Sequence, residues 1–400
     1  MLPPRSIAAR APAFDREALR AALARGGPWP RTGPELAAEV CAAAGRPTGG
    51  WVPRAEDGLL TALQRALTER NLGSVVAAPA YGVAGFAGQL DRFDRVVWMD
   101  PAAGRVDPGP VEVAQALRAG ATAVLLAPIA GDASMLAEVA RQCANAGALL
   151  AVDTRAAHGS RALDAGPEQF GDVCLMGVSL EPVASPCPGA ILSGSGSEAV
   201  VDGAGPAPRA LAWAARSVLR SVRDEPRLRR LWRPPPSAST PPPALLTPPR
   251  WSVAAAAARL RQAPFRAEQR ARHARALRMH CSNLPAVEAV PDPRGFQLAG
   301  GAIPLLAQQR DAVVTELQTM GVEAITGAAA WLAPPDTRSE RAAHVAERLL
   351  LLPLHPFYRP PDLAKLAEAL RKATLRANGD GWCDPTDTTS QGPADEDVTL

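Results

Sequence analysis

Apolar residues along the chain fall into short runs that alternate with segments of helical spacing. The runs that predict strands lie at 74–79, 95–99, 122–127, 148–153, 173–176 and 190–193. Between them, an apolar stripe at a period of about 3.6 residues predicts helices, among them 110–118, 133–146 and one containing Leu59, Leu63 and Leu67. This alternation predicts the fold class α/β, with a mainly parallel sheet and helices on both faces.

The flanking segments suggest a division into four parts. Residues 1–50 form an N-terminal helical segment, with helices expected at 15–25 and at 34–44, the second between a Thr32 start signal and a Gly45 stop. A large domain follows over 51–255 and includes a helix at 209–231 and a Pro-rich loop at 233–249. The composition of this loop is more typical of a stiff connector than of a ligand for a proline-binding module. Residues 256–376 hold a small α+β domain with helices at 311–320 and 361–376.

A long Ala- and Arg-rich helix at 252–280, expected to break near Pro264, leads from the large domain into the small one. Its arginines fit either a solvated face or a phosphate-binding face. Residues 377–400 are polar and acidic, which predicts a disordered tail.

The composition limits the kinds of binding partner and the cellular compartment that are expected for the protein. The chain has 400 residues and a formal net charge of +3, which requires neither a nucleic-acid nor a membrane partner. The six cysteines show no metal-ligand spacing, and no signal peptide or membrane span is evident, so we expect a cytoplasmic protein without a metal site. Only two of the basic residues are lysines, Lys365 and Lys372.

The most informative stretch is the apolar run that starts at Ala148 and delivers Asp153 and then His158 beyond its end. Ligands of parallel sheets collect beyond the carboxyl ends of the strands, where Asp153 is expected to lie. Asp153 could bind a ligand, cap a following helix or hold Arg155. His158 could serve as a structural hydrogen-bonding residue or as an acid or base.

Five segments in order resemble the DegT/StrS-type family, the pyridoxal-phosphate sugar aminotransferases of fold type I. They are D-G-L-L-T-A-L at 57–63, G-S-V-V-A-A-P-A at 73–80, A-P-I-A-G-D-A-S-M-L at 127–136, D-T-R-A-A-H-G at 153–159 and L-P-L-H-P at 352–356. The resemblance implies pyridoxal phosphate or pyridoxamine phosphate as cofactor, a nucleotide sugar as substrate, and a homodimer or a heterodimer with an intact paralogue.

The resemblance also shows which groups have changed. The family's Schiff-base lysine falls on Glu181 or Pro182, and neither side chain forms an imine. Lys365 and Lys372 lie in the other expected domain, and no histidine stands in for the lysine. Glu181 would either face solvent or place a second carboxylate near Asp153, which disfavours an anionic cofactor.

The resemblance also assigns the family's other cofactor contacts to individual residues of this sequence. Asp153 corresponds to the partner of the ring nitrogen, and Ser179 to a serine that touches the phosphate. The phosphate-binding turn falls on Gly58 and Leu59, where Leu59 offers a backbone amide but no hydroxyl, and Asp57 opposes an anion. The aromatic residue that stacks on the cofactor ring in the family aligns with Val83. Tyr81, two residues away, either takes its place or belongs to the core. His158 is the last of the residues expected to bind the cofactor.

Three functions fit these residues. The first is a catalytically degenerate homologue, a pseudoenzyme that acts as a scaffold or regulatory subunit in sugar biosynthesis. The second is an active pyridoxal- or pyridoxamine-phosphate enzyme on a nucleotide sugar with an atypical site. The third is a different α/β enzyme that uses Asp153, His158 and Glu181 as acid and base groups. Loss of the lysine together with the stacking and phosphate side chains favours the first.

Overall fold

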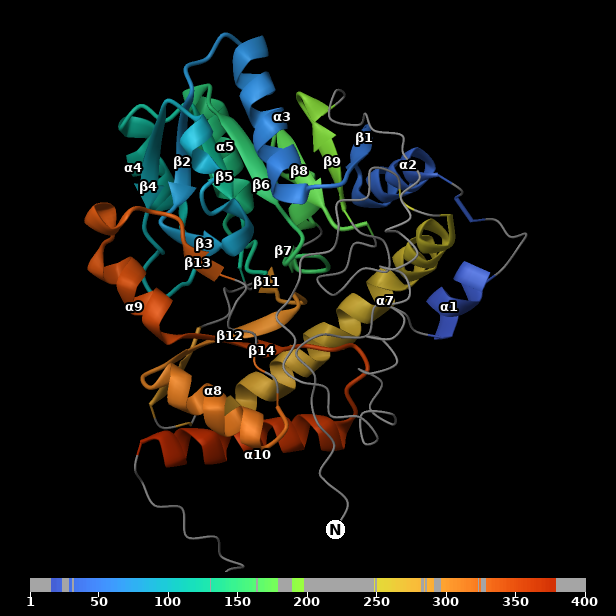
Figure 1. The fold of residues 1–400 in the computed structure, drawn as a ribbon, viewed down its shortest axis with the longest axis vertical. Helices are drawn as coiled ribbons and strands as arrows, with labels where there is room; N and C mark the ends of the chain where they lie inside the picture. Colours follow the sequence, from blue (N-terminus) through green and yellow to red (C-terminus); the bar gives the residue numbers. More distant parts are fainter. Residues whose placement is uncertain are drawn as a thin grey trace, which may run out of the picture.

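A seven-stranded sheet forms the centre of the larger half of the molecule (Figure 1). The computed structural model describes residues 16–23, 29–30, 32–129, 131–162, 165–178, 189–197, 248, 250–281, 284, 286–290, 296–322, 324 and 329–378. The helix expected at 209–231, the Pro-rich loop apart from Pro248, and the tail after Asn378 lie outside these residues.

The strand order of this sheet is β1-β9-β8-β6-β5-β2-β4. From β8 to β4 the neighbouring strands are parallel, whereas β9 is antiparallel to both β8 and β1. The prediction of a mainly parallel α/β sheet is therefore confirmed, and all six predicted strands are present. The strands are β1 (Gly49–Val52), β2 (Val75–Pro79), β4 (Arg95–Met99), β5 (Ala123–Leu126), β6 (Leu149–Asp153), β8 (Val173–Met176) and β9 (Ala190–Gly194).

Helices cover both faces of the large sheet. On one face, the buried leucines of α3 (Ala55–Glu69) pack on alternate strand residues such as Ala151 and Leu175. The intervening residues, such as Val124 and Val152, pack on α4 (Pro110–Arg118) and α5 (Leu136–Ala146). On this second face α2 (Gly33–Ala44) and the start of α7 (Arg250–Cys281) cover β8 and β9. Burial on both faces explains why the strands are continuously apolar.

A three-stranded antiparallel sheet forms the core of the smaller half, in the order β10-β12-β14. It consists of β10 (Val287–Ala289), β12 (Ala302–Ala307) and β14 (Leu349–Pro353). One face packs on α8 (Arg310–Thr319), α10 (Pro360–Ala377) and the end of α7. The other face packs toward the large half, with α9 (Glu340–Arg348) beside it.

Two short strand pairs join the halves. β3 (Tyr81–Val83) pairs with β13 (Ala329–Trp331), and β7 (Arg161–Ala162) pairs with β11 (Phe296–Gln297). The α9 helix was not predicted, although Ser339 caps it by accepting a hydrogen bond from the Ala342 amide at 3.1 Å. A short α1 (Arg16–Leu23) packs on α7, and none of the described helices is both long and apolar enough to cross a membrane.

The predicted break in the long helix near Pro264 is wrong, because α7 runs through this residue. Proline supplies no amide hydrogen to the Leu260 carbonyl, a loss that usually ends or kinks a helix. Here Pro264 lies on the exposed side of α7, and buried alanines on the opposite side hold the helix against its neighbours.

We predict that Pro264→Ala stabilises the protein, because it restores the missing helical hydrogen bond at an exposed position. Removing a helix-interior proline is expected to add about 1–3 kcal/mol to the free energy of unfolding. Urea denaturation followed by circular dichroism measures this change. Glu268→Ala, at another exposed position of α7, is the control and should shift the unfolding midpoint far less; equal effects would contradict the explanation given for the unbroken helix.

Candidate functional site

The candidate site lies where the parallel strands end. In Figure 1 these strands point from the far end of the large half toward the small sheet, so their carboxyl ends meet at the junction of the two halves. Asp153 is the last residue of β6, and a series of turns over residues 154–160 follows it. Asp153 is therefore at the position where this class of sheet binds ligands.

Arg155 occupies both carboxylate oxygens of Asp153. The Arg155 backbone amide and Nε donate to Asp153 Oδ1 at 3.1 and 2.9 Å, and Nη2 donates to Oδ2 at 2.7 Å. The Asp153 side chain is only 4% exposed, so this bidentate pair is largely shielded from water. Such charge-assisted pairs are the strongest class of side-chain hydrogen bond.

Glu56 extends this pair into a three-residue network. Its Oε1 accepts from Arg155 Nη2 at 2.6 Å, although the two residues are 99 positions apart in the sequence. Glu56 comes from the first turn of α3, so the network links α3 to the end of β6. Gly85 makes room for it, since a Cβ there would lie 2.6 Å from Glu56 Cδ.

The electrostatics of this network keep Arg155 charged. Burial alone would lower the pKa of its guanidinium, but the carboxylates of Asp153 and Glu56 raise it above the ordinary arginine value. Two carboxylates around one guanidinium leave the cluster with a formal charge of −1. The cluster therefore disfavours an anionic group next to it.

His158 is completely buried and both of its ring nitrogens are engaged. The Gly177 amide donates to Nε2 at 2.7 Å, and Nδ1 lies 2.5 Å from Glu168 Oε1. Because Nε2 accepts, the proton of a neutral ring is on Nδ1 and points at Glu168. This geometry matches the structural alternative for His158 and leaves neither nitrogen open to a substrate.

The turns that carry Arg155 and His158 are fastened to the rest of the molecule. Gly159 has a φ of +84°, and a Cβ there would lie 2.5 Å from the Cβ of Ala267 on α7. Arg270 of α7 donates to the Ala299 carbonyl at 2.7 Å and to the His158 carbonyl at 3.4 Å. The loop is thus held between α7 and the segment that leads into β12.

The start of α3 differs from the expected phosphate-binding turn. The helix begins at Ala55, so the Gly58 amide already donates to the Arg54 carbonyl at 2.9 Å. The Leu59 side chain is fully buried in the core rather than at the site. Glu56 and Asp57 occupy the first turn, where they satisfy the helix dipole with negative charge of their own.

Tyr81 packs at the junction of the two halves. Its ring meets Trp331 edge to face, with centroids 5.7 Å apart and an interplanar angle of 73°. The backbones of the same two residues are paired between β3 and β13. Only 7% of Tyr81 is exposed, which matches the core or interface alternative.

The remaining predicted positions are placed as follows. Ser179, Glu181 and Pro182 lie outside the described residues. Lys365 and Lys372 both belong to α10, which Figure 1 places at the opposite end of the molecule from β6, beyond the small sheet and α7.

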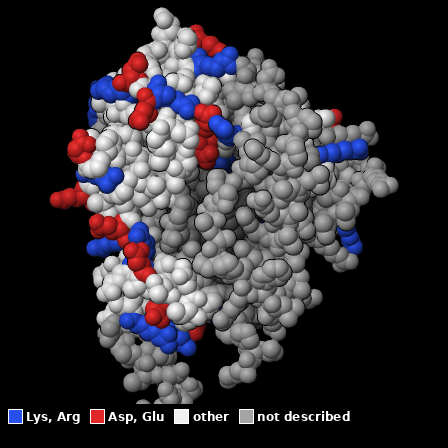
Figure 2. All heavy atoms as spheres, in the orientation of Figure 1, with Lys and Arg blue, Asp and Glu red and all other residues white. Residues whose placement is uncertain are grey.

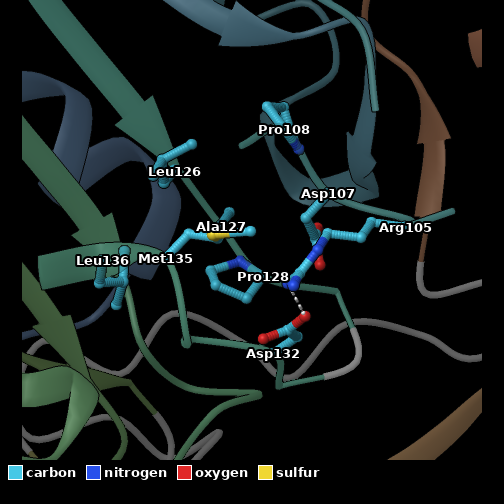
Figure 3. A pocket seen from close by; sticks show the side chains of 9 residues that line it. All are labelled: Arg105, Asp107, Pro108, Leu126, Ala127, Pro128, Asp132, Met135 and Leu136. Atoms are coloured by element: carbon cyan, nitrogen blue, oxygen red, sulfur yellow. Dashed lines mark hydrogen bonds and ion pairs between the residues drawn. The ribbon is translucent and has the colours of Figure 1, made fainter. Parts of the chain in front are cut away.

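A hollow that sequence reasoning missed lies beside the carboxyl end of β5 (Figure 3). Its enclosed space is small, about 20 Å³, and it opens to solvent. Apolar contacts come from Leu126, Pro128 and Met135, and polar ones from Arg105, Asp107 and Asp132. Arg105 and Asp132 pair at 2.6 Å, and no signal in the sequence links these loops.

Asp107 is the unusual group in this hollow. Its Oδ1 accepts from the Ile129 amide at 3.1 Å, while its Oδ2 is buried and has no hydrogen-bond partner among the described residues. Burial raises the pKa of Asp107 to about 7; the Ile129 amide and Arg105 lower it, and Asp132 raises it further. Among the described residues no group of three or more His, Cys, Asp or Glu could hold a metal ion.

The described residues do not fit the pyridoxal phosphate that the sequence resemblance implies. Both oxygens of Asp153 already accept hydrogen bonds from Arg155, so a ring nitrogen would have to compete with the guanidinium. The first turn of α3 carries two carboxylates, Glu56 and Asp57, and Leu59 offers no hydroxyl to a phosphate. In the whole sequence, no lysine lies outside α10.

We predict that His158→Ala destabilises the fold by about 3 kcal/mol, because it strands the Gly177 amide and the Glu168 carboxylate in a buried place. Urea denaturation followed by tryptophan fluorescence measures the loss. His344→Ala, on the exposed side of α9, is the control. A loss no larger than that of the control would show that the buried hydrogen bonds contribute little.

We also predict that Asp107→Asn alters the pH dependence of stability. The folded-state pKa of about 7 exceeds the unfolded value, so Asp107 costs no stability below its unfolded pKa and becomes progressively destabilising as the pH rises through about 7. The variant should be more stable than the parent by about 1–3 kcal/mol at pH of about 8, with the difference closing near pH of about 4. The melting temperatures of the variant and the parent are measured across this pH range, and Asp91→Asn, at an exposed position, is the control. A difference between Asp107→Asn and the parent that does not change with pH would contradict the prediction.

Comparison with known proteins identifies the fold. No protein-family model and no curated protein matches the chain. Among solved structures, the aminotransferase TlmJ from Streptoalloteichus hindustanus matches with a TM-score of 0.67 and 20% identity, covering 93% of this chain and 100% of that one. A DegT DnrJ EryC1 StrS aminotransferase from Brucella abortus matches with a TM-score of 0.61 and 17% identity, over 84% and 89% of the two chains.

A third structure, Spr1654 from Streptococcus pneumoniae in its PMP form, gives a TM-score of 0.67 and 15% identity, over 94% and 99% of the chains. At such low identity these likenesses show the fold and leave the activity open. Together with the seven-stranded, mostly parallel sheet and the small antiparallel sheet, they give the conclusion of this section: the chain has the fold of the DegT/StrS-type sugar aminotransferases, a fold type I architecture.

Proposed function

We propose that this protein is a catalytically degenerate relative of the DegT/StrS-type sugar aminotransferases, and that it acts as a scaffold or regulatory subunit in nucleotide-sugar, polysaccharide or antibiotic-sugar biosynthesis. The observation that carries the proposal is the distribution of amines. The chain has two lysines, and both belong to α10, far from the carboxyl end of β6.

The chemistry explains why this distribution matters. A transaminase needs a lysine amine to hold the cofactor aldehyde as an imine and to move protons during the reaction. Arginine cannot replace lysine, because its guanidinium is protonated at any physiological pH and so is not a nucleophile. The arginines of this chain, however numerous, therefore offer no substitute.

The geometry around Asp153 supports the same proposal. His158 has both ring nitrogens engaged, and Asp153 is bonded through both oxygens to Arg155. These contacts also argue against a different acid–base enzyme in the same place, because such groups need open positions facing a substrate. A strand end whose Asp153 and His158 are both internally satisfied suits binding or assembly better than catalysis.

The quaternary arrangement follows as part of the proposal. We expect the chain to associate through its aminotransferase body, either as a homodimer or as a heterodimer with an intact paralogue that carries the lysine. In the second arrangement, a nucleotide sugar would meet catalytic groups contributed by the partner.

We predict that the purified protein forms no imine with pyridoxal phosphate beyond adventitious reaction of surface amines. The absorption spectrum is recorded before and after borohydride reduction, and any modified residue is located by peptide mapping. The expected result is a spectrum equal to the sum of the protein and the free aldehyde, with no stoichiometric label on either lysine.

The matched control is a Lys365→Arg, Lys372→Arg double variant, which should give the same spectrum as the parent chain. A saturable imine on a lysine of the parent, absent from the double variant, would overturn the proposal. Tight binding of pyridoxamine phosphate without an imine would instead support an active enzyme with an atypical site.

A further inference from the structure

We propose that the exposed face of α7 is the docking surface of the chain's own acidic C-terminal tail, residues 379–400. Six exposed residues at helical spacing form this face, which we call the α7 stripe: Arg261, Phe265, Glu268, Arg272, Arg275 and Met279. The opposite side of α7 carries Ala267 and Arg270, which contact the turns after β6. The stripe is therefore separate from the strand end, and the proposal does not depend on the proposed function.

The α7 stripe and its surroundings concentrate exposed apolar side chains. Among the described residues four large apolar side chains are exposed, and three of them lie on or beside the stripe: Phe265, Met279 and Phe357. Phe357 follows β14, and its ring centroid lies 5.2 Å from Cζ of Arg266, the neighbour of Phe265. Single exposed apolar residues are common, whereas several on one face mark an interaction surface.

The charges of the α7 stripe are unbalanced. The stripe has three arginines and one glutamate. Arg272 approaches Glu268 at 3.8 Å, which is too long for a hydrogen bond, and Arg275 forms no ion pair with a described residue. The stripe therefore attracts a negatively charged segment that also carries apolar side chains.

The cations of α10, where the tail begins, are already paired. Arg371 and Lys372 lie 2.9 and 3.6 Å from Glu368, and Arg376 lies 3.1 Å from Glu316. These pairs leave little uncompensated positive charge on α10. An acidic segment that starts at the end of this helix is therefore attracted more strongly to the α7 stripe than to α10 itself.

The tail supplies the complementary charge. It contains no lysine, arginine or histidine, and its six acidic residues are Asp380, Asp384, Asp387, Asp395, Glu396 and Asp397. Trp382 lies between the first two of these and offers a ring to the apolar side chains of the stripe. Surface ion pairs are individually weak, so the contact depends on several charges together with apolar burial.

The tail begins near one end of the α7 stripe. Ala373 of α10 and Leu277 of α7 pack in the same apolar cluster, and Asn378 is the last described residue. From Met279 to Arg261 the stripe extends about 27 Å along the helix. The 22 residues of the tail reach up to about 70 Å when extended. A tethered segment has a high effective concentration at a surface within its reach, which favours a contact inside one chain.

The test uses a carbodiimide, which joins a carboxylate to an amine in direct contact and does not react with arginine. In the full chain, Arg272→Lys or Arg275→Lys places an amine in the stripe without changing its charge. We expect each variant to form a cross-link to an acidic residue of the tail, located by peptide mass spectrometry in a species of monomer mass. The control is Arg118→Lys, at an exposed position of α4, which should give a several-fold lower yield of tail cross-link.

Two further measurements test the contribution of charge. Arg272→Lys combined with Arg275→Glu should form several-fold less tail cross-link than Arg272→Lys alone, whereas Arg272→Lys combined with Arg118→Glu should form as much. An increase in salt from about 0.1 M to about 1 M shortens the Debye length from about 10 Å to about 3 Å and should also reduce the yield. The cross-link from Arg272→Lys to Glu268, one helical turn away, confirms that the reagent is active.

Three outcomes would overturn the proposal. The first is the absence of a tail cross-link from both stripe variants while the cross-link to Glu268 forms. The second is an equal yield from Arg118→Lys, which would mean that the tail has no preferred surface. The third is a tail cross-link found only in dimers and rising with protein concentration, because the stripe would then bind the tail of a second copy. None of these outcomes depends on pyridoxal phosphate, so the proposed function is tested separately.

Discussion

The structure depends on how one buried carboxylate is neutralised. Asp153 ends the central strand of a sheet that is buried on both faces, so its negative charge is shielded from water. An ionised carboxylate in such a place needs a cation or several hydrogen bonds, since its desolvation is otherwise costly. Arg155 supplies the cation from two residues along the chain, so the fold carries its own counter-ion at a strand end where parallel sheets often bind ligands.

This choice of counter-ion constrains the surrounding backbone. Arg155 must fold back on Asp153 within a tight series of turns, which places His158 inward and Gly159 against α7. Glu56 adds a contact from α3 that fixes the guanidinium from the other side. The turns, α3 and α7 therefore support each other around a closed, satisfied site, with the small sheet attached through Ala299 and Ser160.

The helices and strands could be predicted from the sequence. A strand that is buried on both faces needs a continuous apolar run, and a helix that packs on a sheet needs a stripe of apolar residues on one face. Leu125 and Val152 belong to such runs. Contacts between distant segments left no such pattern: Arg155 as a partner of Asp153 was one of several local alternatives, but Glu56, 99 residues away, was not foreseen. The unbroken α7 was missed because exposure of Pro264 depends on packing, which a sequence pattern does not reveal.

The different surroundings of Asp153 and Leu59 have a physical explanation. Leu59 is an uncharged side chain that packs in the core and leaves no charge to be neutralised. A strand-end aspartate that already has an arginine partner is different, because removing either member strands the other in a buried place. The pair with Arg155 makes the Asp153 carboxylate part of the structural core, so the fold itself accounts for a carboxylate at this place.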